Sequence, residues 1–114
     1  VVFPEGTRNK DYDSPLNDFK AGSFKIPAVT DNKIVPIAIW GTQVVLNTHI
    51  RWKRYPVFMH YLPVIDPADF SGNTIKLAST CQQLVQAEID KMRSQHPHLV
   101  KDFSKGKDYL KYLR

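Results

Sequence analysis

The side chains best suited to chemistry stand at the start of the chain, where a carboxylate, a glycine, a hydroxyl and a guanidinium follow one another as Glu5-Gly6-Thr7-Arg8. An arginine fork can donate two parallel hydrogen bonds to a phosphate, which a lysine point charge cannot do. Glycine lets the backbone approach a ligand that a Cβ would block. These residue types indicate an anion-binding turn with Arg8 as the phosphate ligand. The alternative is a solvated ion pair between Glu5 and Arg8.

A second cation, Lys20, stands twelve residues after Arg8. Apolar residues at helical spacing between Phe19 and Val29 predict a short helix that begins near Lys20, despite Pro27. Such a helix would direct its first N–H groups and the positive end of its dipole toward a ligand beside Arg8. A phosphate fits that position. The alternative is that Lys20 is a solvated surface lysine.

Two apolar runs are expected to support these residues as strands. Val1–Phe3 contains only β-branched and aromatic residues and predicts the end of a buried strand, which Pro4 terminates because it has no N–H to pair. Residues 33–40 are almost continuously apolar, which predicts a strand buried on both faces. A helical crossover between the two runs would make them parallel neighbours.

The second half of the chain predicts one further strand and one long helix. Alternation in residues 55–65 predicts a strand with Val57, Met59 and Tyr61 on one face and Phe58, His60 and Leu62 on the other. An apolar stripe from Thr74 to about Gln95 predicts the helix, and Cys81 lies on this stripe as a core residue. His60 stands among apolar neighbours, which favours a packed histidine over a catalytic one.

Three segments in this order carry a family resemblance: Phe3-Pro4-Glu5-Gly6-Thr7-Arg8, then Phe19-Lys20-Ala21-Gly22, then Val35-Pro36-Ile37. Together they resemble the third and fourth conserved blocks of the glycerolipid acyltransferase family, typified by 1-acylglycerol-3-phosphate acyltransferase. The resemblance is close from Val1 to Thr42 and only general beyond that. Because three ordered blocks match, the resemblance is specific.

The resemblance implies a fold, a reaction and a site. The fold is α/β, with a mixed, largely parallel sheet flanked by helices. The reaction moves a fatty acyl group from acyl-CoA or acyl carrier protein to lysophosphatidate or a related glycerol phosphate, without a cofactor or a metal. The glutamate and arginine of the first block serve acceptor binding, with the arginine on the phosphate. The implied substrate-binding residues are Glu5, Gly6, Thr7, Arg8, Lys20, Gly22 and Pro36.

The catalytic signature of that family is not found in this sequence. The signature is an asparagine-histidine pair with an aspartate five residues after the histidine, and it precedes the Glu-Gly-Thr-Arg block. The residues five positions after the four histidines are Arg54, Ile65, Lys101 and Phe103. We therefore expect no catalytic residue in this chain, with residues 1–95 as the C-terminal part of an acyltransferase domain, residues 96–114 as a basic tail, and no activity of the chain alone.

Charge and composition limit the partners. The net charge is +5 and the sequence pI is about 9.4, which favours anionic partners such as phosphate esters or a membrane surface. We expect the parent protein at the cytoplasmic face of the cell membrane, peripheral or anchored through a preceding segment. Trp52 lies among Arg51, Lys53 and Arg54, a pattern typical of either a solvated edge or a surface for nucleic acid or lipid headgroups. The competing function is therefore a non-catalytic basic module that binds anionic lipid or nucleic acid, whereas the acyltransferase interpretation involves no nucleic acid.

Overall fold

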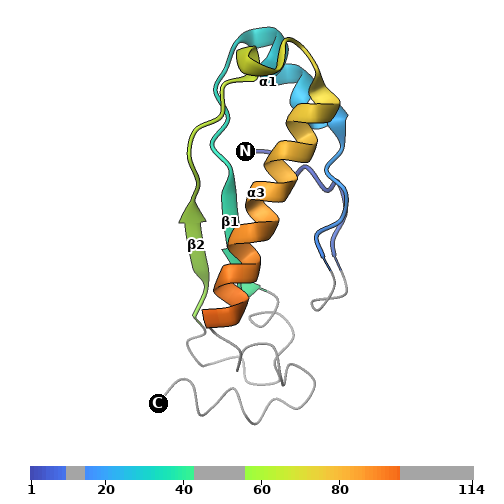
Figure 1. Cartoon of the computed structure of the whole chain (residues 1–114). Coiled ribbons are helices and arrows are strands. Elements are labelled where there is room, and N and C mark those ends of the chain that lie inside the picture. The colour runs from blue at the N-terminus through green and yellow to red at the C-terminus, as the bar shows by residue number, and fades with distance from the viewer. Residues whose placement is uncertain (10–14, 43–55, 96–114) are drawn as a thin grey trace.

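The computed structural model of the chain describes residues 1–9, 15–42 and 56–95. A long helix, α3, packs against two strands, β1 and β2, with a group of short helical turns at one end (Figure 1). The predictions for Arg51–Arg54 and for the basic tail at 96–114 fall outside the described residues. So do His49, His96 and His98.

Helix α3 spans Thr74–Gln95, which confirms the helix predicted from the apolar stripe. Asn73 begins it, because its Oδ1 accepts a hydrogen bond from the N–H of Lys76 at 3.1 Å. The buried residues of the helix are Leu77, Ala78, Cys81, Val85, Ile89 and Met92. They form two packed groups, one with Ala38 and Trp40 of β1 and one with Phe24, so the core lies along one side of the helix.

Strands β1 (Ile37–Trp40) and β2 (Phe58–Tyr61) form an antiparallel pair, extended by the bridge between Ile34 and Ile65. The short helix η2 (Pro67–Phe70) then leads into α3. The alternation predicted for β2 is confirmed, since Phe58 and His60 are half-buried whereas Met59 and Tyr61 are exposed. The α/β character is thus observed, but the pair of strands in the described part of the chain is antiparallel, and a largely parallel sheet is not seen.

The prediction that residues 33–40 are buried on both faces is wrong for this structure. Ala38 and Trp40 face α3 and are buried, whereas Ile37 and Ile39 are exposed on the opposite face. Helix α3 covers only one face of the pair, and an apolar side chain is buried only where another element covers it. We call the uncovered surface the open sheet face and define it as Val35, Ile37, Ile39, Val57, Met59 and Tyr61.

The prediction of a buried strand at Val1–Phe3 is also wrong. These residues pair with no strand in the described ranges, and Phe3 is 78% exposed. A strand requires a neighbour for its N–H and C=O groups, and Pro4 starts a turn instead. The helix predicted after Phe19 is present as a 3₁₀ turn η1 (Ala21–Phe24) that continues into α1 (Lys25–Thr30). None of the helices in the described ranges is both long and apolar enough to cross a bilayer.

Candidate acceptor-binding site

The Glu5-Gly6 segment is a tight turn. The N–H of Gly6 donates to the carbonyl of Phe3 at 3.1 Å, and Pro4 takes the second position of this four-residue turn, for which its fixed φ is suited. Gly6 has a φ of +67°, a left-handed conformation that residues with a Cβ rarely adopt. The sequence therefore turns sharply immediately before Thr7 and Arg8.

A second segment, Pro15–Lys20, is hydrogen-bonded to this turn at two points. The Oε2 of Glu5 accepts from the N–H of Asn17 at 2.9 Å, and the carbonyl of Pro4 accepts from the N–H of Lys20 at 2.9 Å. The first two sequence blocks of the family pattern thus come together, although the residues between them at 10–14 are not described. In this structure, Glu5 acts as an acceptor for the backbone.

The side chain of Lys20 lies over Gly6. A Cβ placed on Gly6 would stand 3.0 Å from the Nζ of Lys20 and 3.1 Å from its Cδ and Cε. The ammonium therefore sits against the turn because residue 6 has no side chain. Lys20 remains exposed, so its charge is open to a ligand from solvent.

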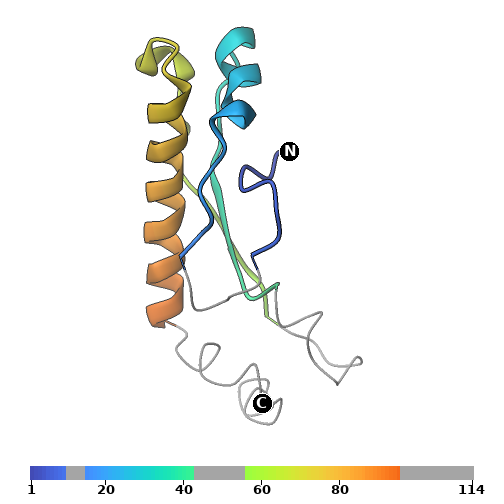
Figure 2. The ribbon, with the colours of Figure 1, turned by 90° about the vertical axis from the view of Figure 1, so that its right-hand side faces the viewer.

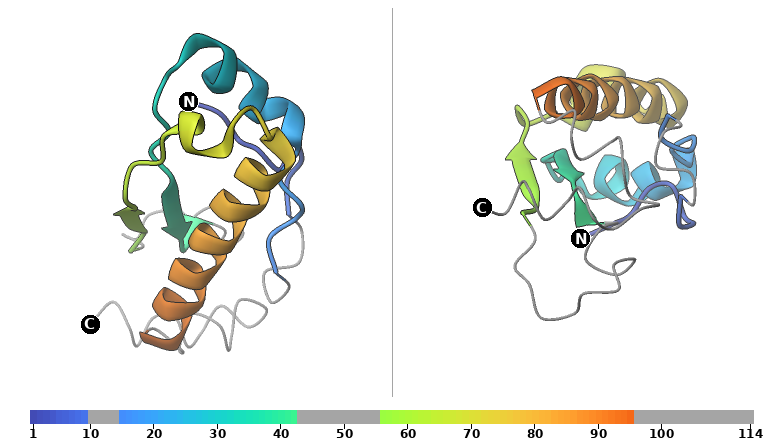
Figure 3. Two further views of the ribbon diagram at one scale, coloured as in Figure 1. Left: turned by 45° about the horizontal axis from the view of Figure 1, so that its top comes forward. Right: turned by 90° about the horizontal axis from the view of Figure 1, so that it is seen from below.

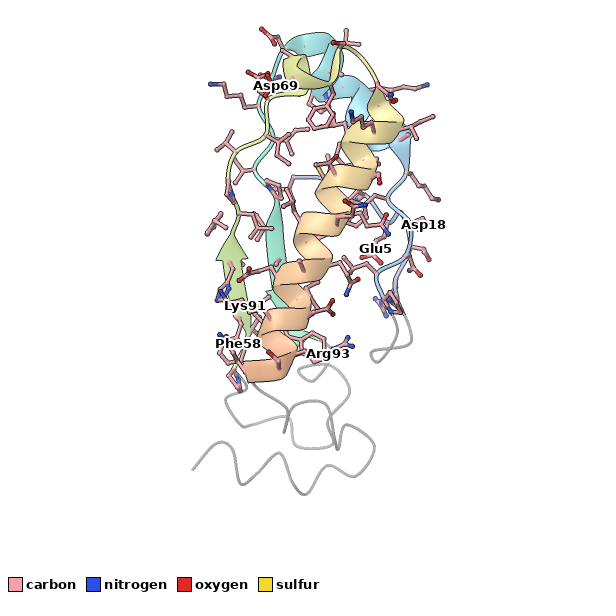
Figure 4. The ribbon with its side chains drawn as sticks, in the orientation of Figure 1. Glu5, Asp18, Phe58, Asp69, Lys91 and Arg93 are labelled. Atoms are coloured by element: carbon pink, nitrogen blue, oxygen red, sulfur yellow. The ribbon has the colours of Figure 1, made fainter. Side chains whose placement is uncertain are left out.

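Arg8 is exposed and makes no hydrogen bond or ion pair with any residue of the described ranges. The alternative interpretation, an ion pair between Glu5 and Arg8, is not formed there. Figure 4 shows Glu5 and Asp18 on the same side of α3. No side chain of residues 1–9, 15–42 or 56–95 thus occupies the guanidinium donors of the exposed Arg8, and an anion can reach them from solvent.

Two other predicted residues are held by the fold in different ways. Gly22 lies in η1, where an added Cβ would meet nothing within 4 Å. Pro36 is buried immediately before β1, and its carbonyl accepts a hydrogen bond from the N–H of Leu62 at 2.9 Å. Within the residues the structure describes, no hydrogen bond links either of them to the Glu5-Gly6 turn.

Sequence reasoning missed three residues that organise this region: Asn17, Gln82 and Gln86. The two glutamines of α3 accept hydrogen bonds from the backbone of the Pro15–Lys20 segment, at Phe19 and Leu16. Polar residues beside a helical apolar stripe look like ordinary surface positions in a sequence. The spacing of four between Gln82 and Gln86 places them on one face of the helix, and this spacing was the only sign in the sequence that they act together.

A groove of about 570 Å³ runs between the Pro15–Lys20 segment and α3. It is lined by Phe19, Ala21, Ala78, Gln82 and Gln86 among others, and its lining includes neither Glu5 nor Arg8. The groove is therefore a separate feature from the Glu5-Gly6 turn.

The other reactive side chains of the described residues have structural roles. The Nδ1 of His60 is paired with the Oε1 of Glu88 at 2.7 Å, which links β2 to α3. Burial raises the pKa of the Cys81 thiol to about 11, so the thiolate needed for a nucleophile is scarce at neutral pH. In the described ranges, no three histidine, cysteine or carboxylate side chains gather as a metal site would require.

Comparison with known proteins agrees with the site's sequence pattern. Residues 1–40 match the family model described as Acyltransferase. The chain is therefore similar to the acyltransferase family over these residues, and the described turn and the Lys20 segment both lie inside the match.

Among individual proteins, the chain is similar to enzymes named 1-acyl-sn-glycerol-3-phosphate acyltransferase. It is 35% identical over 66 residues to that of Borreliella burgdorferi, a match covering 57% of this chain and 26% of the relative. It is 48% identical over 46 residues to a chloroplastic enzyme of Brassica napus, and 46% identical over 46 residues to one of Arabidopsis thaliana. These two matches cover 40% of this chain and 13% and 12% of the relatives. The matches thus span about a quarter or less of each relative, and no solved structure matches the chain.

Proposed function

We propose that this chain forms the acceptor-binding part of an enzyme that transfers a fatty acyl group from acyl-CoA or acyl carrier protein to a lysophosphatidate-type glycerol phosphate. The observation that carries the proposal is the arrangement at the Glu5-Gly6 turn. Two segments of the family pattern meet there, the Lys20 ammonium lies over Gly6, and the Arg8 guanidinium has no protein partner in the described ranges. Two cations beside a glycine turn suit a phosphate ester.

In the proposed reaction, the acceptor hydroxyl attacks the thioester carbonyl, the acyl–sulfur bond breaks and the thiol leaves. The hydroxyl loses its proton to a general base, for which the family resemblance implies a histidine outside this chain. Arg8 would bind the phosphate with two parallel donors, and Lys20 would add a second positive charge. Holding the phosphate fixes the hydroxyl near the base, and such positioning supplies a large share of the rate enhancement in two-substrate reactions.

The proposed parent enzyme acts at the cytoplasmic face of the cell membrane. Its acceptor and product would be lipids, and the net charge of +5 favours contact with anionic headgroups. This membrane contact is tested by co-sedimentation of the full-length enzyme with vesicles of phosphatidylglycerol and phosphatidylcholine at 50 and 300 mM salt. We expect binding that weakens as salt rises, and its absence at both salt concentrations would contradict a charge-driven membrane contact.

The phosphate site can be tested in the isolated chain by NMR titration with glycerol 3-phosphate. We expect shifts at Arg8 and Lys20, and we expect Arg8→Ala to weaken binding by roughly 30- to 1000-fold, since a bidentate charged contact contributes about 2 to 4 kcal/mol. Arg8→Lys should recover only part of this loss. Lys33→Ala is the matched control, because it removes an exposed charge outside the turn and should leave the titration unchanged.

The chain alone should show no acyl transfer in an assay with acyl-CoA and lysophosphatidate, and turnover by the purified chain would contradict the assignment of catalysis to residues outside it.

The competing function, a basic binding module, is tested by filter binding to single-stranded DNA. Tight binding with a steep salt dependence, together with no effect of Arg8→Ala, would favour the module.

A further inference from the structure

The Pro15–Lys20 segment is hydrogen-bonded on two sides. On one side, the N–H of Leu16 donates to the Oε1 of Gln86 and the N–H of Phe19 donates to the Oε1 of Gln82, both at 2.8 Å. On the other side, the N–H groups of Asn17 and Lys20 donate to Glu5 and to the carbonyl of Pro4. The segment therefore links α3 to the Glu5-Gly6 turn. Figure 2 shows α3, this segment and the N-terminal segment in that order.

Each glutamine is itself oriented by a carboxylate. The Nε2 of Gln82 donates to Asp18 at 3.3 Å, and the Nε2 of Gln86 donates to Asp90 at 2.9 Å. These contacts fix which end of each amide faces the backbone, because the carboxylates accept only from the NH₂ group. The oxygen of each amide is thus directed at the segment.

The helix that carries the glutamines contributes most of the buried core residues of the described structure. Cys81 and Val85, which immediately precede Gln82 and Gln86 in the sequence, are buried in the core. A side chain anchored on such a helix has a better-defined position than one on a loop. Figure 3 shows α3 along one side of the molecule, with the N-terminal segment across from it.

We propose that Gln82 and Gln86 are positioning residues for the phosphate site. They hold the Pro15–Lys20 segment against α3, and this holds the Lys20 ammonium over Gly6, two residues before Arg8. Both glutamines lie outside residues 1–40 that match the family model, so the match assigns them no role. The proposal rests on the proposed function for the identity of the ligand, but the position of Lys20 can be measured without any ligand.

The test uses the ¹⁵N-labelled 114-residue chain with Gln82→Met, Gln86→Met and the double variant. Methionine keeps the volume of glutamine and removes the accepting oxygen. Gln83→Met is the matched control, since Gln83 is exposed on the same helix and makes no hydrogen bond to the described segment. We expect faster amide exchange at Phe19 in Gln82→Met and at Leu16 in Gln86→Met, and normal exchange at both in the control.

The decisive readout is the nuclear Overhauser effect between the Lys20 side chain and the Gly6 Hα protons. We expect it in the unaltered chain and in Gln83→Met, and we expect its loss in the double variant, at a temperature where these three proteins give the same helical circular dichroism. Persistence of this contact in the folded double variant would overturn the positioning role.

Titration with glycerol 3-phosphate gives the functional readout. The double variant should bind about four- to hundredfold more weakly than the unaltered chain, because two backbone hydrogen bonds are lost and each contributes about two- to tenfold. Equal affinities would overturn the proposal even if the contact is lost. If the unaltered chain binds no glycerol 3-phosphate, the proposed phosphate site fails, whereas the structural part of the positioning role is still decided by the Lys20–Gly6 contact.

Discussion

Alanine variants of three glycines separate two effects of adding a Cβ: the loss of stability from a left-handed backbone and the displacement of the Lys20 side chain. Gly6 has φ +67° and lies under Lys20, Gly72 has φ +78° and an added Cβ there would meet nothing within 4 Å, and Gly22 has neither feature. An alanine in the left-handed region costs roughly 1 to 2 kcal/mol. The same change where the backbone is compatible stabilises by about 0.4 to 1 kcal/mol, because it restricts the unfolded chain.

We therefore expect Gly72→Ala and Gly6→Ala to lower the free energy of unfolding by about 1 to 2 kcal/mol each, and Gly22→Ala to leave it unchanged or raise it slightly. The contact at Gly6 adds little to the loss, because the flexible end of Lys20 can move by the few tenths of an ångström required. The assay is urea unfolding followed by helical circular dichroism. The dependence of the unfolding free energy on urea concentration also reports whether the unfolding remains two-state.

The functional consequence should separate the two left-handed glycines. Gly6→Ala shifts the Lys20 side chain away from the turn by a few tenths of an ångström and should weaken binding of glycerol 3-phosphate, whereas Gly72→Ala should not. If Gly6→Ala bound glycerol 3-phosphate as tightly as Gly72→Ala does, the idea that residue 6 is a glycine for the sake of Lys20 would be refuted.

Three further predictions concern α3. Met92→Ala should lower the free energy of unfolding by about 2 to 5 kcal/mol, since Met92 is 0% exposed, whereas Leu84→Ala on the exposed side should cost under about 1 kcal/mol in the same urea assay. Burial raises the pKa of the Cys81 thiol from 9.0 to about 11, so its contribution to stability should be constant below pH 9 and fall by about 2 to 3 kcal/mol between pH 9 and 11. Cys81→Ala should lack this part of the slope in pH-dependent unfolding. Glu88→Ala should cost at most about 1 kcal/mol, because the His60 side chain is 43% exposed, and a loss above 3 kcal/mol in urea unfolding would contradict a solvent-screened contact.

Elements with a complete local pattern could be predicted from the sequence. The stripe of α3 gave its limits at Thr74 and Gln95, because helix packing depends on a period that the sequence displays directly. The alternation around Met59 and His60 was predicted for the same reason. Cys81 was correctly assigned to the core because it lies on that stripe.

Features that depend on distant partners could not be predicted. Ile37 and Ala38 are both apolar, and only the placement of α3 makes one exposed and the other buried. Likewise, the β-branched Val1 and Val2 have strand propensity but no neighbour in the described ranges with which to pair. The link between Phe19 and Gln82 joins residues 63 positions apart, and no local pattern signals such a contact.

The open sheet face determines how the isolated chain will behave as a laboratory reagent. Ile37 and Ile39 expose their side chains, and the register with β2 turns their N–H and C=O groups toward the other edge of β1, which pairs with no strand among the described residues. An apolar surface beside an unpaired edge is a template for edge-to-edge association, so we expect concentration-dependent clustering and losses on hydrophobic resins during purification. Ile39→Lys, which sets a charge beside that edge, should give a monodisperse sample for spectroscopy without touching the Glu5-Gly6 turn.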